Sequence, residues 1–245
     1  TGGAGSTSWA DSANWASGTP SAGQDARIGS SLYNPTSFPL VTSGQSFTVN
    51  DLWVGYDGIG SLSLERGGTL TASRLGYIGY LSGGVGLVTV DGSTTLLAIE
   101  DDLTLGYAGV GELTITGGAL VDSNQYGLLG VQAGSSGHII IDGARSQLDT
   151  ANSLSVGVGG NGIVTLTNGG LIATGGNVFI GENSGSHGGV SLSGTGSRWS
   201  IGGNLFVGHS GYGELTLANN AQMIMGGRAY IGFNAGSRGE MTVAG

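Results

Sequence analysis

Apolar and polar residues alternate in short runs along most of the chain. In the segment LWVGYDGIGSLSLERGGTLTA, the apolar positions Leu52 and Val54, then Leu62 and Leu64, then Leu70, are each spaced by one residue that should face outward. Alternation with a period of two indicates β-strands that bury one face. The segment therefore predicts three short strands in succession.

This pattern returns along the chain at a fixed interval. Similar segments begin at Leu103, Leu154 and Leu205, and the glycines Gly55, Gly106, Gly157 and Gly208 are 51 residues apart each time. Self-similarity at a period of about this length indicates a solenoid or an array of repeats. We therefore treat residues 51–245 as four tandem repeats, the last one truncated.

Each repeat contains a second, weaker motif, written YIGY, LLGV, FIGE and YIGF. Its glycines, Gly79, Gly130, Gly181 and Gly232, share the 51-residue spacing and divide each repeat into parts of 24 and 27 residues. Either length suits one coil of a three-sided β-helix. Each repeat is therefore predicted to be a double coil.

Equivalent apolar residues form columns when the coils are stacked. One column runs Val54, Ile78, Leu105, Leu129 and onward. An antiparallel array of hairpins would not return the same residue type to the same place after three strands, whereas a coil does. The sequence predicts an all-β, right-handed parallel β-helix with three strands per coil and about eight regular coils.

Residues 1–50 stand outside the repeat. A solenoid end exposes strand edges and core, so a terminal segment of different composition is expected to act as a cap. We expect Trp9 and Trp15 to cover this end, and a loop around Pro35 and Pro39 to lead into a strand-like FTVNDL segment.

Glycine supplies 53 of the 245 residues, which disfavours helix and favours many turns. Paired glycines such as Gly58 and Gly60 are expected at the turn between the first two strands, as are Gly109 and Gly111 in the next repeat. No GK[ST] segment follows them, so they do not predict a phosphate-binding loop. Replacement of the usual glycines by LANNAQ weakens the turn prediction in the fourth repeat.

Charge and composition limit the partners. Seven basic and sixteen acidic residues give a net charge of −9, without a basic patch that would neutralise phosphates, so nucleic acid is not an expected partner. No apolar run approaches the roughly 20 residues of a membrane-spanning helix. The absence of cysteine is compatible with export but does not establish it.

The chain resembles the passenger repeats of type V secreted bacterial autotransporters, which are shared with repeats of PEP-CTERM-associated surface proteins. The resemblance is carried by NWxxGxP…D between Asn14 and Asp25, by the L-x-V-G…G-x-G-x-L-T-I-x-x-G-G half-repeat, and by GTGSRW from Gly194 to Trp199. It implies a passenger exported by a Gram-negative cell that acts in adhesion, in aggregation or as a spacer. The chain carries no translocator barrel or sorting tail, so the resemblance leaves its anchoring open.

A catalytic site in a repeat protein would break the repeat with a cluster of reactive residues. His138, His187 and His209 occupy different offsets and are expected to be solvated turn residues rather than a metal site. Glu100, Asp101 and Asp102, with Asp51 one repeat earlier, are the sharpest enzymatic alternative, because polysaccharide lyases of this fold bind calcium through carboxylates. We expect solvated corners here, no enzyme and no cofactor.

The Asp-Gly pairs at Asp91 and Asp142 are expected to be turns in which the aspartate bonds its own backbone.

Aromatic residues fill much of the outward column of the first strand. This column holds Trp53, Tyr77, Phe179, Phe206 and Tyr230, interrupted by Thr104, Leu128 and Ser155, with Tyr56, Tyr80, Tyr107 and Phe233 just past the glycine. Stacked rings stabilise a β-helix by themselves, but an exposed aromatic stripe also suits carbohydrate stacking or self-association. We expect an interaction surface here.

Hydroxyl residues fill the outward column of the middle strand. In coil order it holds Ser63, Thr89, Thr114, Thr165, Ser191, Thr216 and Thr242, interrupted by Ile140. Good β-propensity accounts for this ladder. A flat hydroxyl face would also suit ice or crystalline polysaccharide.

The sequence thus predicts an extracellular structural or adhesive β-helix segment. Its expected partners are a host or neighbouring-cell receptor, a glycan, or another copy of itself, with a membrane reached only through an anchor outside this chain. Its expected location is secreted or on the outer surface of a Gram-negative cell. A carbohydrate-active β-helix enzyme, such as a polysaccharide lyase, is the alternative. An ice-binding or filament-forming scaffold is the third candidate.

Overall fold

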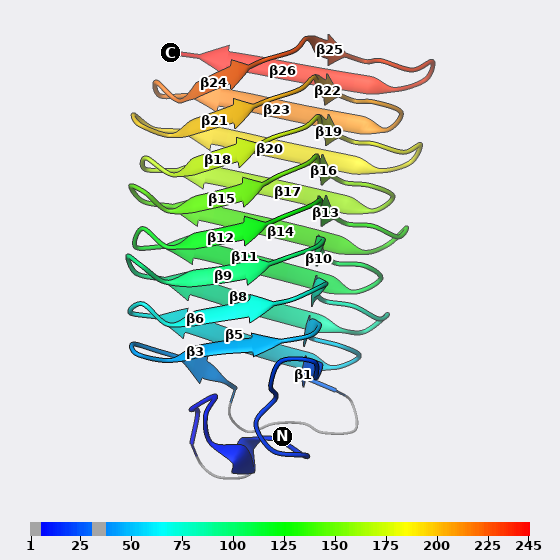
Figure 1. The fold of residues 1–245 in the computed structure, drawn as a ribbon. Helices are drawn as coiled ribbons and strands as arrows, with labels where there is room; N and C mark the ends of the chain where they lie inside the picture. The colour runs from blue at the N-terminus through cyan, green and yellow to red at the C-terminus, as the bar shows by residue number, and fades with distance from the viewer. Residues whose placement is uncertain (1–5, 31–37) are drawn as a thin grey trace.

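The chain winds into a right-handed parallel β-helix in which each coil gives one strand to each of three sheets (Figure 1). The computed structural model describes residues 6–30 and 38–245. Pro35 lies outside these residues. The predicted fold class is confirmed, and the residues described also include one short 3₁₀ segment, η1 (Ser12–Asn14).

Within the described residues, two sheets have nine strands and one has eight. The first sheet contains β1 (Ala26–Ile28), β4 (Leu52–Val54), β7 (Gly76–Ile78), β10 (Leu103–Leu105), β13 (Gly127–Leu129), β16 (Leu154–Val156), β19 (Val178–Ile180), β22 (Leu205–Val207) and β25 (Ala229–Ile231). The second sheet contains β2 (Leu40–Val41), β5 (Ile59–Glu65), β8 (Val85–Asp91), β11 (Val110–Thr116), β14 (Ser136–Asp142), β17 (Asn161–Thr167), β20 (His187–Ser193), β23 (Tyr212–Ala218) and β26 (Arg238–Ala244). The third sheet contains β3 (Ser46–Val49), β6 (Thr69–Ala72), β9 (Leu96–Ile99), β12 (Leu120–Ser123), β15 (Gln147–Thr150), β18 (Leu171–Thr174), β21 (Arg198–Ile201) and β24 (Gln222–Met225).

Strands pair in register with the coil before and the coil after. Val54 pairs with Ile78, and Ile78 with Leu105, so the apolar columns of the sequence become continuous columns of the core. These three side chains are at most 1% exposed. At the C-terminal coil, where no further strand follows within residues 38–245, Ile231 of the same column is 51% exposed. Burial therefore depends on a coil on each side.

The corner between the first and second strands is built on glycine in every coil. Gly55 and its equivalents, Gly79, Gly106, Gly130, Gly157, Gly181, Gly208 and Gly232, all have positive φ. The second glycines of the expected turn pairs, Gly60, Gly111, Gly162 and Gly213, instead lie inside second-sheet strands. A Cβ at Gly111 would lie 2.1 Å from the Ile78 carbonyl oxygen, because the strand begins by crossing the preceding coil at close range.

The corner between the second and third strands alternates between two forms. In one form, two successive left-handed residues make the turn, as at Gly117 and Gly118. In the other, a left-handed glycine and a second left-handed residue two positions later precede a buried hydroxyl residue, as at Gly143, Arg145 and Ser146. The Ser146 hydroxyl donates to the Asp142 carbonyl at 2.7 Å. That hydroxyl also accepts the N–H of Gly118 from the preceding coil at 3.1 Å. The two forms therefore interlock in pairs of coils.

The turn prediction for the fourth repeat needs a correction. Asn219 and Asn220 have φ of 53° and 65°, so the LANNAQ segment makes the same turn as the glycine pairs in other repeats. Asparagine tolerates the left-handed region better than other non-glycine residues, and its short side chain forms local hydrogen bonds there. The Asn219 side-chain amide donates to Ser193 Oγ at 2.9 Å, which ties the turn to the coil before it.

At the corner leading into the first strand, a side-chain acceptor binds the backbone of the next coil. Asp51 accepts from the Leu75 N–H and Asp102 from the Tyr126 N–H, each at 3.1 Å. Asp51 is only 7% exposed, so the expectation of solvated corners is wrong for it. Burial raises the pKa of the Asp102 carboxyl, which its backbone hydrogen bond partly offsets.

The N-terminal segment covers one end of the helix. Trp9 is fully buried and packs on Phe47 of the first coil, with ring centroids 5.7 Å apart. Trp15 packs edge-on against Trp9 and donates its indole N–H to the Trp9 carbonyl at 2.9 Å. Strands β1, β2 and β3 complete one coil below the repeats. Over residues 6–30 and 38–245, no helix is long and apolar enough to cross a membrane.

Candidate functional site

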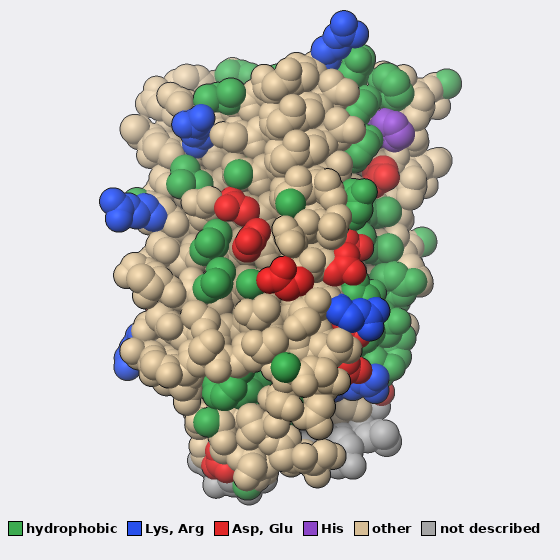
Figure 2. All heavy atoms as spheres, in the orientation of Figure 1, with side chains coloured by type: hydrophobic (Ala, Val, Ile, Leu, Met, Phe, Trp, Pro, Cys, Tyr) green, Lys and Arg blue, Asp and Glu red, His purple; other side chains and the backbone are tan. Residues whose placement is uncertain are grey.

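The outward aromatic residues form two separate clusters along the first corner. The lower aromatic cluster consists of Trp53, Tyr56, Tyr77, Tyr80 and Tyr107. The upper aromatic cluster consists of Phe179, Phe206, His209, Tyr230 and Phe233. Between them the same column holds Thr104, Leu128 and Ser155, which pair in register. Figure 2 shows hydrophobic side chains gathered down the right-hand edge, beside the first-sheet strands of Figure 1.

The lower aromatic cluster is held by stacking between coils and edge-on packing within them. Trp53 and Tyr77 are stacked at 4.5 Å, and Tyr80 meets Trp53 edge-on at 4.5 Å. The Arg27 guanidinium lies 4.8 Å from the ring centroid of Tyr56, a cation–π arrangement that closes the cluster toward the N-terminal cap. Burial, followed by the neighbouring tyrosine Tyr80, raises the pKa of the Tyr77 phenol.

The upper aromatic cluster is more regular. Phe206 stacks at 5.0 Å on both Phe179 and Tyr230, with interplanar angles of 5° and 11°. His209 stacks on Phe233 at 5.4 Å, so this histidine is enclosed by rings. Phe206 is only 8% exposed.

The expectation of an exposed aromatic stripe is therefore corrected in one respect, the exposure of the rings. The interruption at Thr104, Leu128 and Ser155 is as the sequence has it, but the rings are mostly half-buried because each covers the next; Phe233, at the last coil, is 47% exposed. Parallel strands bring successive rings into contact, and this is a structural use of the aromatic residues.

Exposed aliphatic residues border the lower aromatic cluster and enlarge it. Ile59 is 57% exposed, Leu81 37% and Val110 46%. Ile59 and Val110 both pair in register with Val85, so they continue one apolar column at the start of the second-sheet strands. We call Ile59, Leu81, Val85 and Val110 with the lower aromatic cluster the lower apolar patch. The column continues through Ser136 and Asn161 in the next coils, where it is polar.

The structure aligns the hydroxyl ladder in the middle of the second sheet. Thr114 pairs with Thr89 and with Ile140, and Ser191 pairs with Thr165 and Thr216. Ser63 pairs with Thr89 at one end and Thr242 with Thr216 at the other. In the neighbouring column, Thr116 and Thr167 donate to Asp91 and Asp142 at 2.6 and 2.7 Å. The aspartates of the Asp-Gly turns thus bind the next coil, and Asp142 also accepts from the backbone N–H of Gly143, as expected of such a turn.

The histidines are not three solvated turn residues. His138 lies in β14 and His187 at the start of β20, where the ring of His187 stacks on Tyr212 at 5.1 Å. His187 Nδ1 lies 2.9 Å from Asn161 Oδ1. Among the described residues, no group of three histidine, cysteine or acidic side chains is arranged to hold a metal ion.

A pair of carboxylates on the third sheet was not predicted from the sequence. Asp122 of β12 pairs in register with Asp149 of β15, and both line a hollow of about 580 Å³ that Arg198 also borders. Burial raises the pKa of both carboxyls, and Asp149 further raises that of Asp122. Figure 2 shows acidic side chains on this face. The sequence does contain a sign of this pair. Asp122 and Asp149 occupy successive positions of one column, between Ala98 in the coil before and Ala173 in the coil after.

Known proteins offer few matches. No family model matches the chain. The "Uncharacterized lipoprotein YdeK" of Escherichia coli (strain K12) is 28% identical over 194 residues, which are 78% of this chain and 14% of that protein. The chain thus spans a small part of that relative. A crystal structure of a TibC-catalyzed hyper-glycosylated TibA fragment covers 91% of this chain and 99% of its own, at 16% identity and a TM-score of 0.16. No functional inference follows from a structural likeness at that score.

Proposed function

We propose that this chain is a structural and adhesive segment of a bacterial surface protein, in which the β-helix gives length and the lower apolar patch binds other surfaces. The observation that carries the proposal is this patch: half-buried rings bordered by Ile59 and Val110, which are 57% and 46% exposed. A contiguous exposed apolar patch is typical of a surface that binds a protein or a ligand, whereas single exposed apolar residues are common on any protein surface.

A location on the cell envelope is part of the proposal. The matched Escherichia coli protein is named a lipoprotein, and the repeat motifs resemble those of autotransporter passengers. Anchoring would depend on parts of the protein other than these residues. Many copies displayed side by side would turn a weak contact into a firm one through multivalency.

The test is cell aggregation by the full protein displayed on bacteria, with Ile59→Ser, Leu81→Ser and Val110→Ser combined. These side chains lie on the surface, at 57%, 37% and 46% exposure, so the triple variant should keep its thermal unfolding temperature. We expect aggregation or adhesion to fall strongly. The matched control is Ile224→Ser, which removes an aliphatic side chain of similar exposure, 49%, from β24 in the third sheet.

Equal aggregation by the triple variant and the wild type, at equal surface display, would remove the patch from the proposal. A second combination, Tyr56→Leu with Tyr80→Leu and Tyr107→Leu, keeps apolar cover while removing the rings. If adhesion is lost only in this variant, binding depends on the aromatic rings themselves. That result would favour a glycan as the partner over a second copy of the chain.

The second candidate function is that of a carbohydrate-active enzyme, and the acidic pair favours it. Asp122 and Asp149 are adjacent in register, have raised pKa values, and border a hollow with Arg198. Two carboxylates in different protonation states are the usual means of glycoside cleavage. Incubation with a panel of polysaccharides, followed by assay of new reducing ends, tests this function. Activity lost in Asp149→Asn would establish it, and no cleavage by the wild type would end it.

A further inference from the structure

Three tyrosines of the lower aromatic cluster form a column of phenols on successive coils. Tyr80 stacks on Tyr56 with ring centroids 5.5 Å apart and on Tyr107 at 5.2 Å, with interplanar angles of 28° and 21°. All three side chains are half-buried, so part of each ring remains accessible to solvent. We call these three residues the tyrosine column.

The backbone holds the tyrosine column in register. The N–H of Tyr80 donates to the Gly55 carbonyl at 2.9 Å, and the N–H of Tyr107 donates to the Gly79 carbonyl at 3.0 Å. Each phenol therefore follows a left-handed glycine and lies one coil after the phenol before it. Neighbouring rings are thus held near the spacing of adjacent strands, about 4.8 Å.

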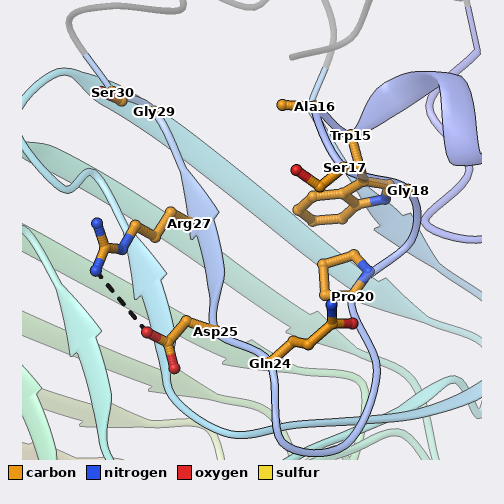
Figure 3. Close-up of a pocket in the computed structure, with 10 residues that line it drawn as sticks. All are labelled: Trp15, Ala16, Ser17, Gly18, Pro20, Gln24, Asp25, Arg27, Gly29 and Ser30. Atoms are coloured by element: carbon orange, nitrogen blue, oxygen red, sulfur yellow. Dashed lines mark ion pairs between the residues drawn. The ribbon is translucent and has the colours of Figure 1, made fainter.

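The N-terminal end of the column differs from its other end. Arg27 belongs to the coil before, and its guanidinium lies 4.8 Å from the Tyr56 ring centroid. Figure 3 shows Arg27 reaching out from β1, away from Trp15. A cation at this position opposes the removal of an electron from the Tyr56 ring, because it repels the positive charge that results. Tyr80 and Tyr107 are therefore the pair that is more easily oxidised.

The upper aromatic cluster has the same stacking without the same chemistry. Its column places Tyr230 on Phe206, and a phenylalanine ring has no phenol that a mild oxidant could convert to a radical. Tyr212 stacks on His187. In the part of the chain that the structure describes, only the lower aromatic cluster brings tyrosine rings into contact with one another.

We propose that the tyrosine column is a site of oxidative cross-linking, in which Tyr80 and Tyr107 are joined as dityrosine. A haem peroxidase using hydrogen peroxide removes one electron and one proton from each phenol. The two radicals form a bond between the ring carbons beside their oxygens, and the hydrogen on each of these carbons moves to the oxygen of its own ring. Two tyrosines and one hydrogen peroxide thus give one dityrosine and two water molecules.

The cross-link joins two neighbouring coils covalently in a chain that contains no cysteine and so has no disulfide. It closes a loop of the chain and restricts the unfolded state, as a disulfide does. The cross-linked chain therefore unfolds at a higher temperature. The site is independent of the proposed function, because the phenols would couple even if the lower apolar patch bound nothing.

Treatment of the dilute whole chain with a haem peroxidase and hydrogen peroxide tests the proposal. The monomer should gain dityrosine fluorescence, and mass spectrometry of its proteolytic peptides should find those of Tyr80 and Tyr107 joined with the loss of two hydrogens. Tyr80→Phe keeps a stacked ring but removes the shared phenol, so the monomer should lose this fluorescence. Tyr126→Phe is the matched control, because it removes a phenol that is 44% exposed and lies outside the column, and it should leave the yield unchanged.

Equal fluorescence of the treated monomer in Tyr80→Phe and in the wild type would overturn the proposal. So would dityrosine found only in covalent dimers, or oxidised tyrosines without joined peptides in the wild-type monomer. A wild-type monomer joined only between Tyr56 and Tyr80 would overturn the choice of pair. Both variants keep a ring in place, so their unfolding temperatures before treatment should match that of the wild type.

Discussion

The first and second corners of each coil both turn the chain from one sheet to the next, but different interactions stabilise the two turns. At the first corner, a left-handed glycine such as Gly106 and a strand glycine such as Gly111 occur in every coil, because backbones there approach within the space of a Cβ. At the second corner, left-handed residues occur in every coil of the repeats, a buried hydroxyl such as Ser146 is present in alternate coils, and residue identity varies. One corner is fixed by steric exclusion and the other by hydrogen bonding.

This difference explains the double-coil repeat. The first-corner loop spans residues 55–58 in one coil and residues 79–84 in the next, and the second corner spans residues 66–68 and then residues 92–95. These extra residues account for the difference between 24 and 27 residues per coil. Because a hydroxyl in the longer coil receives an N–H from the shorter one, as Ser146 does from Gly118, the two coils form one unit.

The largest expected effect is at the first corner. Gly111→Ala would place Cβ 2.1 Å from the Ile78 carbonyl oxygen and 2.7 Å from the Gly106 nitrogen, both backbone atoms that cannot move alone. We expect destabilisation at or above the upper end of the roughly 1–3 kcal/mol that overpacking costs. Gly189→Ala is the matched control in β20, since nothing lies within 4 Å of its Cβ. Chemical unfolding of both variants measures the contrast, and equal stability would contradict steric exclusion.

Next in size is the second corner. Ser146→Ala leaves the Gly118 N–H without its acceptor and the Asp142 carbonyl without this donor, in a site where Ser146 is fully buried. The expected loss is about 1–3 kcal/mol. Ser191→Ala, on the exposed hydroxyl ladder, should change unfolding little. A Ser146 variant as stable as the Ser191 variant would show that hydrogen bonding does not couple the coils.

A smaller gain is expected where the second corner carries strain. Arg145 has φ of 70°, whereas the equivalent residue one repeat later is Gly196, with φ of 88°. A left-handed conformation costs a non-glycine residue about 1–2 kcal/mol. Replacing it with glycine removes this cost, but glycine loses more conformational entropy on folding, which offsets part of the gain. Arg145→Gly should therefore raise the free energy of unfolding by about 0.5 kcal/mol. A loss of stability would mean that the Arg145 side chain makes a compensating contact.

The smallest effect concerns the third corner and depends on pH. Burial raises the pKa of the Asp102 carboxyl in the folded state, so its contribution to stability is complete below the unfolded pKa and declines as pH rises through the folded value. Asp102→Asn keeps an acceptor for the Tyr126 N–H without the charge. We expect a gain of a few tenths of a kcal/mol at neutral pH, because solvent screens a half-exposed group, and none at pH 3. A gain that is the same at both pH values would exclude the charge as its source.

The sites were less predictable than the fold. The sequence pattern places Trp53 and Phe206 in one interrupted column, but it does not show that rings in adjacent coils cover one another. Asp122 and Asp149 were missed because each is unremarkable within its own strand, and only pairing in the third sheet makes them neighbours. Spacing along one strand does not show which face has a hollow.

The sequence by itself determined the coil. Alternating apolar residues require strands with one buried face, and a 51-residue period returns each strand to its own column, so parallel stacking follows from local patterning. The tertiary structure decided what the corners and outward faces do. Whether Gly111 is a turn or a close backbone crossing, and whether Asp51 is solvated or buried, depends on atoms contributed by other coils. These contacts join residues 24 or more positions apart. The periodic pattern along the sequence does not specify the distances between atoms of different coils.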